Sequence, residues 1–192
     1  EAWNTQVGSR VPPDWQESIA RVLDTGELEE IEIGVGKQIF AAICTPFVES
    51  GYVNIYGHDI TQRKHSEAKL HYLSMHDAFT GLYNRNFFEE ELARLEHSRH
   101  FPVSVMIADL NGLKQLNDRL GHAAGDELIR HAARLLKAAF RGEDIVARVG
   151  GDEFAVLLPD NDVAAVDHVL TRLRNRIEVE NKHRRAAPLS LA

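Results

Sequence analysis

The sequence predicts an α+β protein built in two parts. Residues 1–61 combine one helical stretch with three strand-like runs, and residues 62–75 are charged and free of glycine and proline. From residue 76 onward the apolar residues follow helix and strand periods in the order βααββαβ. That order implies a ferredoxin-like, palm-type antiparallel sheet with its helices on one face.

Composition and charge limit the classes of function. The chain has 192 residues, of which 44% are hydrophobic and 27% charged, and its net charge is −7. This acidic balance disfavours binding to nucleic acid or anionic lipid. An acidic protein that binds a polyphosphate needs a divalent metal to screen the charge. The single cysteine, Cys44, excludes an internal disulfide and favours a reducing compartment.

Nothing in the sequence indicates a membrane segment. No run approaches the roughly 18 apolar residues that a span requires, and no signal peptide is recognisable. We therefore expect a cytoplasmic protein with no membrane contact from this chain. The sequence begins without methionine and stops in the apolar run Pro188–Ala192, as if cut from a longer chain. A membrane tether through other regions is therefore left open.

The first unit begins with a predicted helix. Pro12-Pro13-Asp14 has the residues of a helix start, apolar residues follow at helical spacing, and Thr25-Gly26 ends the pattern. Three β-rich runs come next, separated by short glycine-containing turns, which favours an antiparallel meander. The expected strands are Leu28–Val35, Gln38–Phe47 and Tyr52–Thr61.

Two details of this unit, residues 1–61, carry a resemblance. The run Gly51-Tyr-Val-Asn-Ile-Tyr-Gly57 and the exit sequence Asp59-Ile60-Thr61 resemble the C-terminal half of a PAS sensor domain. The elements that hold a PAS ligand would precede Glu1, so the ligand and the signal are unassigned. Residues 62–75 form the connecting helix, for which we prefer a dimerising signalling role over that of a passive linker.

The second unit begins at His76 with a turn-rich segment. Val103–Ala108 is a continuous apolar run, typical of a central strand buried on both faces, and it ends at Asp109. Gly121–Gly125 interrupts the helical pattern, and Pro188–Ala192 resembles the start of another strand. Helices are expected around Phe88–Leu95, Leu113–Leu120, Glu127–Phe140 and Val163–Ile177.

The candidate chemistry gathers around a predicted β-hairpin. Ile145–Val149 and Phe154–Leu158 flank the turn Gly150-Gly151-Asp152-Glu153. Glycine leaves the backbone open to a bulky ligand, so Gly150 and Gly151 suit the approach of a phosphate. Taken alone, the turn is explained equally well as an acidic surface loop.

Asp109, Asp152 and Glu153 bring three carboxylates to this region. In a palm-like sheet a strand end and a neighbouring hairpin tip can lie side by side, and carboxylates brought together repel unless they share a cation. Hard oxygen ligands beside substrate phosphates fit Mg²⁺. The alternative is that Asp109 caps a helix and the hairpin pair is solvated. Spacing alone does not decide between them.

Polar residues after Asp109 offer contacts for a nucleotide. Lys114 and Asn117 are three residues apart and share a helix face. Lysine can neutralise a phosphate, and an amide can contact a base edge. Asp126 opens the next predicted helix, where N-capping alone explains an aspartate. His122 is equally consistent with a loop histidine.

Three ordered motifs resemble the GGDEF domain of diguanylate cyclases: HDAFTGLYNR (76–85), DLNGLKQLNDRLGHAAGD (109–126) and RVGGDEF (148–154). The resemblance covers residues 76–192, and the family's last strand and helix, with their phosphate-binding Lys and Arg, are expected beyond Ala192. It implies a bacterial enzyme that joins two GTP into cyclic di-GMP and releases two pyrophosphates, across a homodimer with one GTP per half-site. The departures are mild, at Phe79, Tyr83, Asn111 and Leu113.

The resemblance also implies a catalytic centre. Asp109, the Leu110 carbonyl and Asp152 would hold Mg²⁺ or Mn²⁺, with Glu153 supporting the metal site. Asp152 would also help to deprotonate the ribose 3′-hydroxyl. Lys114 would stabilise the transition state at the phosphate.

Recognition of the nucleotide follows from the same resemblance. Asn117 and Asp126 would contact guanine, which replaces the capping explanation of Asp126. His122 would line the nucleotide pocket, and Gly150 and Gly151 would let the backbone approach the phosphates.

A second pattern is regulatory. Arg141-Gly-Glu-Asp144, five residues before the glycine pair, resembles the family's RxxD site, through which cyclic di-GMP inhibits its own synthesis. An arginine fork suits guanine and phosphate. Arg172 falls where the family often places a supporting arginine. As a bare pattern, RxxD is usually a surface ion pair, but its offset from the hairpin favours inhibition.

Two rival functions share these motifs. A catalytically silent GGDEF module would bind GTP or cyclic di-GMP and regulate a partner domain, but the intact GGDEF residues favour the enzyme. A relative that also uses ATP is disfavoured by Asp126, because an acidic group suits the guanine N1–H and amino donors. The sequence does not give the activity of a chain that ends at Ala192, or whether the sensor activates or represses.

Overall fold

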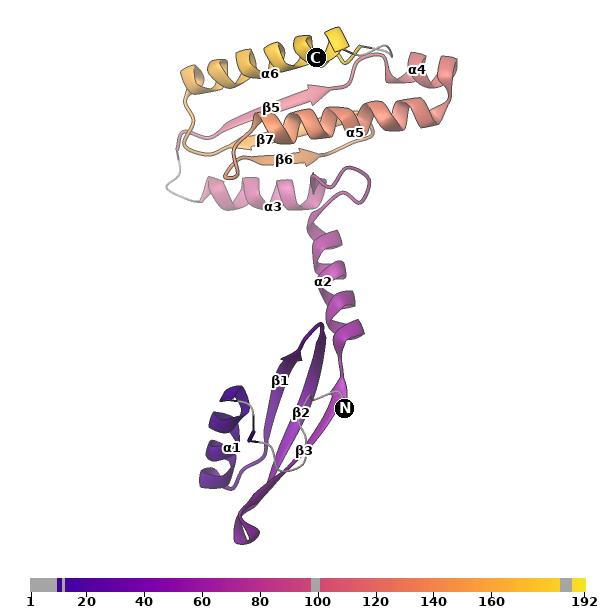
Figure 1. Cartoon of the computed structure of the whole chain (residues 1–192). Helices are drawn as coiled ribbons and strands as arrows, with labels where there is room; N and C mark the ends of the chain where they lie inside the picture. Colours follow the sequence, from indigo (N-terminus) through magenta and orange to yellow (C-terminus); the bar gives the residue numbers. More distant parts are fainter. Residues whose placement is uncertain (1–9, 12, 98–100, 184–187) are drawn as a thin grey trace. The chain divides into compact units, whose positions relative to one another are not determined.

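The computed structural model describes residues 10–11, 13–97, 101–183 and 188–192. The chain divides into two compact units, Glu1–Leu70 and His71–Ala192 (Figure 1). Helix α2 (Thr61–Met75) begins in the first unit and ends in the second. Each unit is described by itself.

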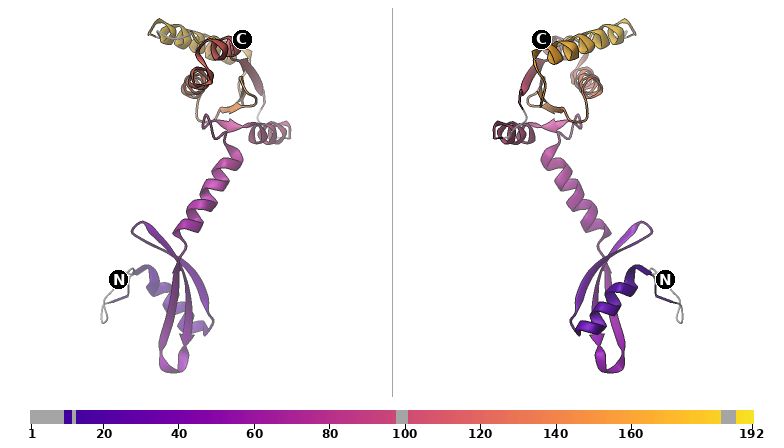
Figure 2. Two further views of the ribbon diagram at one scale, coloured as in Figure 1. Left: turned by 90° about the vertical axis from the view of Figure 1, so that its right-hand side faces the viewer. Right: turned by 90° about the vertical axis from the view of Figure 1, so that its left-hand side faces the viewer.

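The first unit is an antiparallel meander covered by one helix. Its strands pair in the order β1-β2-β3, as the sequence predicts. Helix α1 packs against one face, where Trp15, Ile33 and Ala42 form a small core (Figure 2). The elements are α1 (Pro13–Thr25), β1 (Glu29–Val35), β2 (Gln38–Phe47), the 3₁₀ turn η1 (Val48–Ser50) and β3 (Tyr52–Asp59).

The exit sequence after β3 ties the start of α2 to the meander. The Asp59 Oδ1 atom accepts a hydrogen bond from the Thr61 amide, two residues later, at 2.8 Å. The Thr61 hydroxyl in turn accepts from the Ile39 amide of β2 at 2.8 Å. Hydrogen bonds from the Thr61 hydroxyl and amide lower the pKa of Asp59.

The second unit is built on a four-stranded sheet in the order β4-β6-β7-β5. The pairs β5–β7 and β6–β7 are antiparallel, and the short pair β4–β6 is parallel. At the C-terminal end of the chain, Leu191 forms a single bridge with Leu110, where the sequence suggests the start of a strand. The strands are β4 (Tyr83–Asn84), β5 (Ser104–Asp109), β6 (Ile145–Arg148) and β7 (Glu153–Leu158).

Helices cover both faces of this sheet, whereas the sequence suggests one covered face. The main core joins α5 and α6 to one face, with Phe154 and Val156 of β7 at its centre. Helix α3 packs on the other face through Phe88 and Leu95 (Figures 1 and 2). The helices are α3 (Arg85–Glu96), α4 (Leu113–Leu120), α5 (His122–Ala139) and α6 (Val163–His183).

Strand β5 differs from its prediction as a strand buried on both faces. Its apolar residues Val105 and Ile107 are 49% and 62% exposed. Only Met106 and Ala108, on the alternate face, contribute to the main core. These two side chains are exposed because β5 lies at the end of the strand order, whereas α3 packs over β4, β6 and β7. A continuous apolar run cannot reveal which side of a strand will lack a neighbour.

Candidate functional site

The predicted hairpin forms between β6 and β7. The turn is closed by hydrogen bonds from the Val149 and Gly150 amides to the Glu153 carbonyl, at 3.0 and 3.3 Å. Val146 and Phe154 are buried in the main core on either side of it. Because both strands are anchored in this way, the turn is held at a fixed place at the end of the sheet.

Asp109 and Glu153 lie directly opposite each other in the β5–β7 pair. Residues paired across an antiparallel ladder point to the same face of the sheet, so the side chains of Asp109 and Glu153 start from neighbouring positions on one face. The adjoining backbone is joined as well, since the Leu110 amide donates to the Asp152 carbonyl at 3.0 Å. The structure thus brings Asp109, Leu110, Asp152 and Glu153 together.

The two glycines of the turn have different surroundings. A Cβ on Gly150 would lie 2.5 Å from Oε2 of Glu153, whose side chain folds back over the turn. A Cβ on Gly151 would meet nothing within 4 Å. A side chain at position 150 would therefore require the Glu153 side chain to move, whereas Gly151 leaves open space in which a ligand can approach the backbone.

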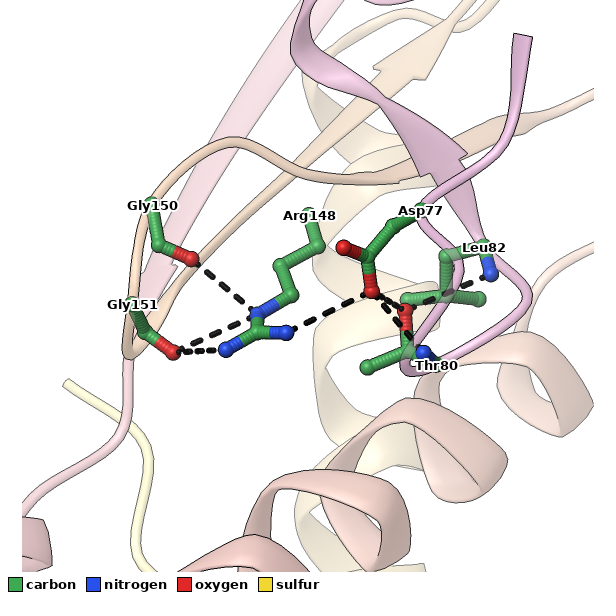
Figure 3. A network of polar contacts seen from close by, with 6 residues as sticks. All are labelled: Asp77, Thr80, Leu82, Arg148, Gly150 and Gly151. Carbon is green, nitrogen blue, oxygen red and sulfur yellow. Dashed lines mark hydrogen bonds and ion pairs between the residues drawn. The ribbon is translucent and has the colours of Figure 1, made fainter. Parts of the chain in front are cut away.

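Arg148, which was not among the predicted site residues, holds this turn through hydrogen bonds to its carbonyl groups. Its Nη2 donates to the Gly151 carbonyl at 2.7 Å and its Nε to the Gly150 carbonyl at 3.1 Å. Its Nη1 lies 3.4 Å from Oδ1 of Asp77 (Figure 3). A planar guanidinium with five donors can satisfy all three partners at once. The sequence places Arg148 directly before Val-Gly-Gly-Asp, which indicates its nearness to the turn but not its pair with Asp77.

Asp77 is fixed by a second set of hydrogen bonds. Its Oδ1 accepts from the Thr80 amide at 2.8 Å and from the Thr80 hydroxyl at 2.6 Å. Partial burial raises the pKa of Asp77, but the hydrogen bonds from Thr80 and the charge of Arg148 outweigh it, so the pKa lies below its ordinary value. Two guanidinium groups lie over the ring of Phe79, with the Cζ of Arg130 4.3 Å and that of Arg148 5.1 Å from the ring centroid.

The residues expected to contact a nucleotide lie on α4 and α5. Lys114 is exposed in the first turn of α4, and Asn117 is half-buried one turn later. A Cβ on Gly125 would lie 2.0 Å from Oδ1 of Asn117. The Asn117 carboxamide therefore occupies the space where any other residue at position 125 would have its side chain.

The structure corrects the predicted start of α5. The helix begins at His122, not at Glu127, and Asp126 lies inside it. Capping therefore does not explain Asp126. The sequence predicts that Gly125 breaks the helix. In the structure it is a buried residue inside α5, where the absence of a side chain leaves space for Asn117. His122 is exposed at the first position of the helix.

The Arg141–Asp144 segment is a tight turn. The Asp144 amide donates to the Arg141 carbonyl at 3.2 Å, and Oδ2 of Asp144 accepts from the Arg141 amide at 2.7 Å. Asp144 is 6% exposed, whereas the Arg141 side chain is exposed and pairs loosely with Glu143 at 3.7 Å. Arg172 of α6 donates to the Ala139 carbonyl at the end of α5.

The donor set around Asp109 suits a hard divalent cation. Within residues 10–11, 13–97, 101–183 and 188–192, no group of three or more His, Cys, Asp or Glu side chains could hold a metal ion. Mg²⁺ does not require one, since it is usually held by one or two carboxylates together with substrate phosphates. The carboxylates of Asp109 and Asp152, with the neighbouring backbone carbonyl of Leu110, fit that mode.

Comparison with known proteins decides the family. Residues 74–190 match the family model described as "Diguanylate cyclase, GGDEF domain". The chain belongs to the GGDEF domain family. The second unit is therefore an α+β GGDEF fold.

In the part of the chain that the structure describes, no helix has the length and apolarity to cross a membrane.

Several relatives of this GGDEF chain carry informative names. The "Probable diguanylate cyclase DgcE" of Escherichia coli strain K12 is 40% identical over 121 residues, which is 60% of this chain and 11% of that protein. The GGDEF domain of DgcB from Caulobacter crescentus, solved in complex with c-di-GMP, has a TM-score of 0.56 at 26% identity. That match covers 62% of this chain and 74% of that one.

Another solved structure is the diguanylate cyclase SiaD from Pseudomonas aeruginosa, in complex with its activator SiaC. It has a TM-score of 0.56 at 29% identity, over 68% of this chain and 52% of that one. The chain spans 11% to 19% of the lengths of the curated relatives with which it shares the GGDEF domain.

Proposed function

We propose that this chain carries the catalytic domain of a diguanylate cyclase, which joins two GTP into cyclic di-GMP and releases two pyrophosphates. The pairing of Asp109 with Glu153 beside the open Gly151 turn carries the proposal. The family match and the name of the relative DgcE support it. In this proposal each domain of a homodimer holds one GTP.

The metal site of the proposal consists of Asp109, Asp152 and the Leu110 carbonyl, with Glu153 beside them. Bound there, Mg²⁺ or Mn²⁺ would offset the negative charge of the triphosphate. In this proposal Asp152 would take the proton of the ribose 3′-hydroxyl, as a general base does. Lys114, an exposed cation on the helix that follows Asp109, would neutralise charge that develops at the reacting phosphate.

Guanine recognition is assigned to the junction of α4 and α5. The carboxylate of Asp126 can accept from both the N1–H and the amino group of guanine, which adenine cannot match. Asn117 packs against Gly125, one residue before Asp126 in the same helix, so amide and carboxylate belong to one locality. His122 would line the edge of the pocket, and Gly150 and Gly151 would lie under the phosphates.

Control of the reaction is assigned to regions outside this centre. We place a PAS-like sensor in residues 1–61, a signalling helix in residues 62–75 and the cyclase in residues 76–192. Arg141 and Asp144, supported by Arg172, would bind cyclic di-GMP and inhibit its synthesis. The free, buried Cys44 agrees with a reducing compartment such as the bacterial cytoplasm.

Incubation of the chain, and of a longer form that continues past Ala192, with GTP and Mg²⁺ tests the proposal. We expect cyclic di-GMP and pyrophosphate, and their loss in Asp109→Asn. Asp118→Asn is the matched control, since Asp118 is an exposed carboxylate on α4 outside the site. Bound GTP without release of pyrophosphate would reject the cyclase and favour a silent binding module.

A competition assay tests the choice of base. Excess ATP should leave the rate with GTP unchanged in the wild-type protein, because adenine has an acceptor at N1 and lacks the adjacent N1–H and 2-amino donors that Asp126 would bind. Equal use of ATP would contradict the assignment of Asp126.

A further inference from the structure

The ring of Phe79 brings together two arginines from different elements of the second unit. Phe79 lies between α2 and β4, and its side chain is half-buried against the main core. The Cζ of Arg130 on α5 lies 4.3 Å from the ring centroid, and the Cζ of Arg148 on β6 lies 5.1 Å from it. Both distances fall within the range of about 6 Å in which an aromatic ring attracts a cation.

The two arginines belong to different halves of the proposed site. Arg148 donates hydrogen bonds to the two carbonyls of the Gly150-Gly151 turn, which is assigned to the triphosphate (Figure 3). Arg130 comes four residues after Asp126 in α5, and residues at this spacing share a helix face. The ring of Phe79 therefore joins the helix assigned to guanine to the turn assigned to the phosphates.

The ring attracts two groups that repel each other. The guanidinium groups of Arg130 and Arg148 lie within about 10 Å of each other, a separation at which physiological salt screens like charges only in part. Each has its own carboxylate, with Asp77 3.4 Å from Arg148 and Glu127 3.8 Å from Arg130. The Arg148 side chain is only 15% exposed, so its attraction to the ring is weakly screened. Phe79 is thus a partner that both cations share.

We propose that Phe79 is a positioning residue for GTP, which fixes α5 relative to the Gly150-Gly151 turn by holding Arg130 and Arg148 near one ring. Phe79 itself touches no part of the nucleotide. One GTP has to reach Asp126 with its base and the turn with its phosphates, so the separation of these two places decides whether both contacts form. A displacement of about 1 Å among groups that hold a substrate can slow a reaction about 100-fold. This assignment rests on the proposed function.

Two substitutions separate this link from simple packing. Phe79→Leu keeps an apolar side chain in the core and removes the π face that attracts cations. Arg130→Met keeps a long unbranched side chain and removes the guanidinium. If Phe79 only fills space in the core, the loss of charge at position 130 has no effect on the Gly150-Gly151 turn.

Amide hydrogen exchange on the whole chain without nucleotide tests the link. The amides of Val149 and Gly150 donate to the Glu153 carbonyl, so their exchange reports the opening of the turn. Phe79→Leu and Arg130→Met should each speed exchange at residues 149–153 about threefold, the effect of losing a weak cation–π contact. The double variant should exchange no faster than the faster single variant, because both changes break one link.

Arg134→Met is the matched control for Arg130→Met. It makes the same exchange about one turn further along α5, at an exposed arginine that pairs with Glu127, and it should leave exchange at residues 149–153 unchanged. Wild-type exchange of the turn in Arg130→Met would overturn the inference. Faster exchange in Phe79→Leu alone would also overturn it, because the ring would then act through packing. Thermal unfolding identifies effects of global instability, and Arg130→Met, at a side chain that is 42% exposed, keeps the test valid if Phe79→Leu does not fold.

Steady-state kinetics with GTP and Mg²⁺, on the form that continues past Ala192, separates this inference from the proposed function. In Phe79→Leu and Arg130→Met we expect kcat to fall about tenfold with a smaller change in KM, because the reacting groups are misplaced. Equal kcat in the wild type and both variants would reject the positioning role alone. A wild-type protein that does not turn over GTP would reject the proposed function, whereas the exchange measurements would still decide whether Phe79 links α5 to the turn.

Discussion

The guanidinium of Arg148 joins Asp77 to the Gly150-Gly151 turn. Nη1 lies 3.4 Å from Oδ1 of Asp77, and Nη2 lies 2.7 Å from the Gly151 carbonyl. Both side chains are largely shielded, with exposures of 15% for Arg148 and 25% for Asp77. One side chain thus connects the segment where the GGDEF unit begins with the turn to which we assign the triphosphate.

Replacing Arg148 by alanine should destabilise the fold and slow turnover. The change removes the ion-pair partner of a partly buried carboxylate and the side-chain donor of two turn carbonyls. We expect the free energy of unfolding to fall by about 2–3 kcal/mol, between the cost of one unpaired buried group and that of a broken buried ion pair. Urea unfolding of the variant at neutral pH measures the change.

Two further variants define what Arg148 supplies. Arg148→Lys should recover little, because one ammonium cannot reach the turn carbonyls and Asp77 together. Arg134→Ala is the matched control, since its pair with Glu127 is exposed, and it should change stability by less than about 0.5 kcal/mol. Equal stability of Arg148→Ala and Arg134→Ala would contradict the bridging role.

The shifted pKa of Asp77 predicts a specific acid sensitivity. Its folded-state pKa lies below the ordinary value of 3.8 because the hydrogen bonds from Thr80 and the charge of Arg148 outweigh the effect of burial. A lowered pKa contributes stability that is complete above the unfolded value and is lost as the pH falls through the folded value. Stability from this group is therefore lost at and below about pH 4.

Asp77→Asn should remove that part of the pH dependence. The amide oxygen can still accept from Thr80, but it has no charge to lose. Urea unfolding between about pH 7 and pH 2.5 should show a shallower loss for Asp77→Asn than for the wild type, with the curves separating below about pH 4. Curves that stay parallel over the whole range would show that Asp77 does not titrate as described.

The effects on stability of replacing Gly125 and Asn117 should be coupled. Gly125→Ala should destabilise the wild type but stabilise a variant that lacks the Asn117 side chain. Glycine to alanine inside a helix normally stabilises by about 1 kcal/mol. Here the new Cβ would lie 2.0 Å from Oδ1 and 2.8 Å from Cγ of Asn117. Gly125→Ala alone should therefore destabilise and displace the Asn117 amide, which would weaken GTP binding.

A double-mutant cycle measures this coupling. In an Asn117→Ala background the carboxamide is gone, so Gly125→Ala should recover its normal stabilising effect. We expect an interaction energy of about 1–3 kcal/mol, as for residues in direct contact. Independent, additive effects of the two changes would contradict the contact.

The sequence predicted the hairpin and the order of elements because both depend on local patterns. The glycine pair between apolar runs gave the turn, and the strand spacing gave the meander of the first unit. Three features depended on distant neighbours. Val105 and Ile107 are exposed because β5 ends the strand order, which an apolar run does not show. Gly125 lies inside a helix, and the carboxamide of Asn117 occupies the space that a side chain at position 125 would need.

The third feature is Arg148. The residue stands in the motif that carried the resemblance, but its partner Asp77 lies 71 residues earlier in the chain. Spacing within a motif could not indicate that pair. The carboxylates of the site could be proposed from sequence, whereas the group that positions their turn required the structure.

The difference between Gly150 and Gly151 gives a direct test of where the ligand lies. Alanine at position 151 would meet no atom within 4 Å, and the backbone there does not need a positive φ angle. Gly151→Ala should therefore fold with a stability within about 0.5 kcal/mol of the wild type. Its Cβ would occupy the space that we assign to the triphosphate, so the affinity for GTP should fall about tenfold or more.

Gly150→Ala serves as the contrasting variant. Its Cβ would lie 2.5 Å from Oε2 and 3.2 Å from Cβ of Glu153, so the glutamate must move and the turn itself should be disturbed. Thermal unfolding and GTP titration of both variants separate the two effects. If Gly151→Ala binds GTP as tightly as the wild type, the triphosphate does not lie over this turn, and Gly151 is open only because it faces solvent.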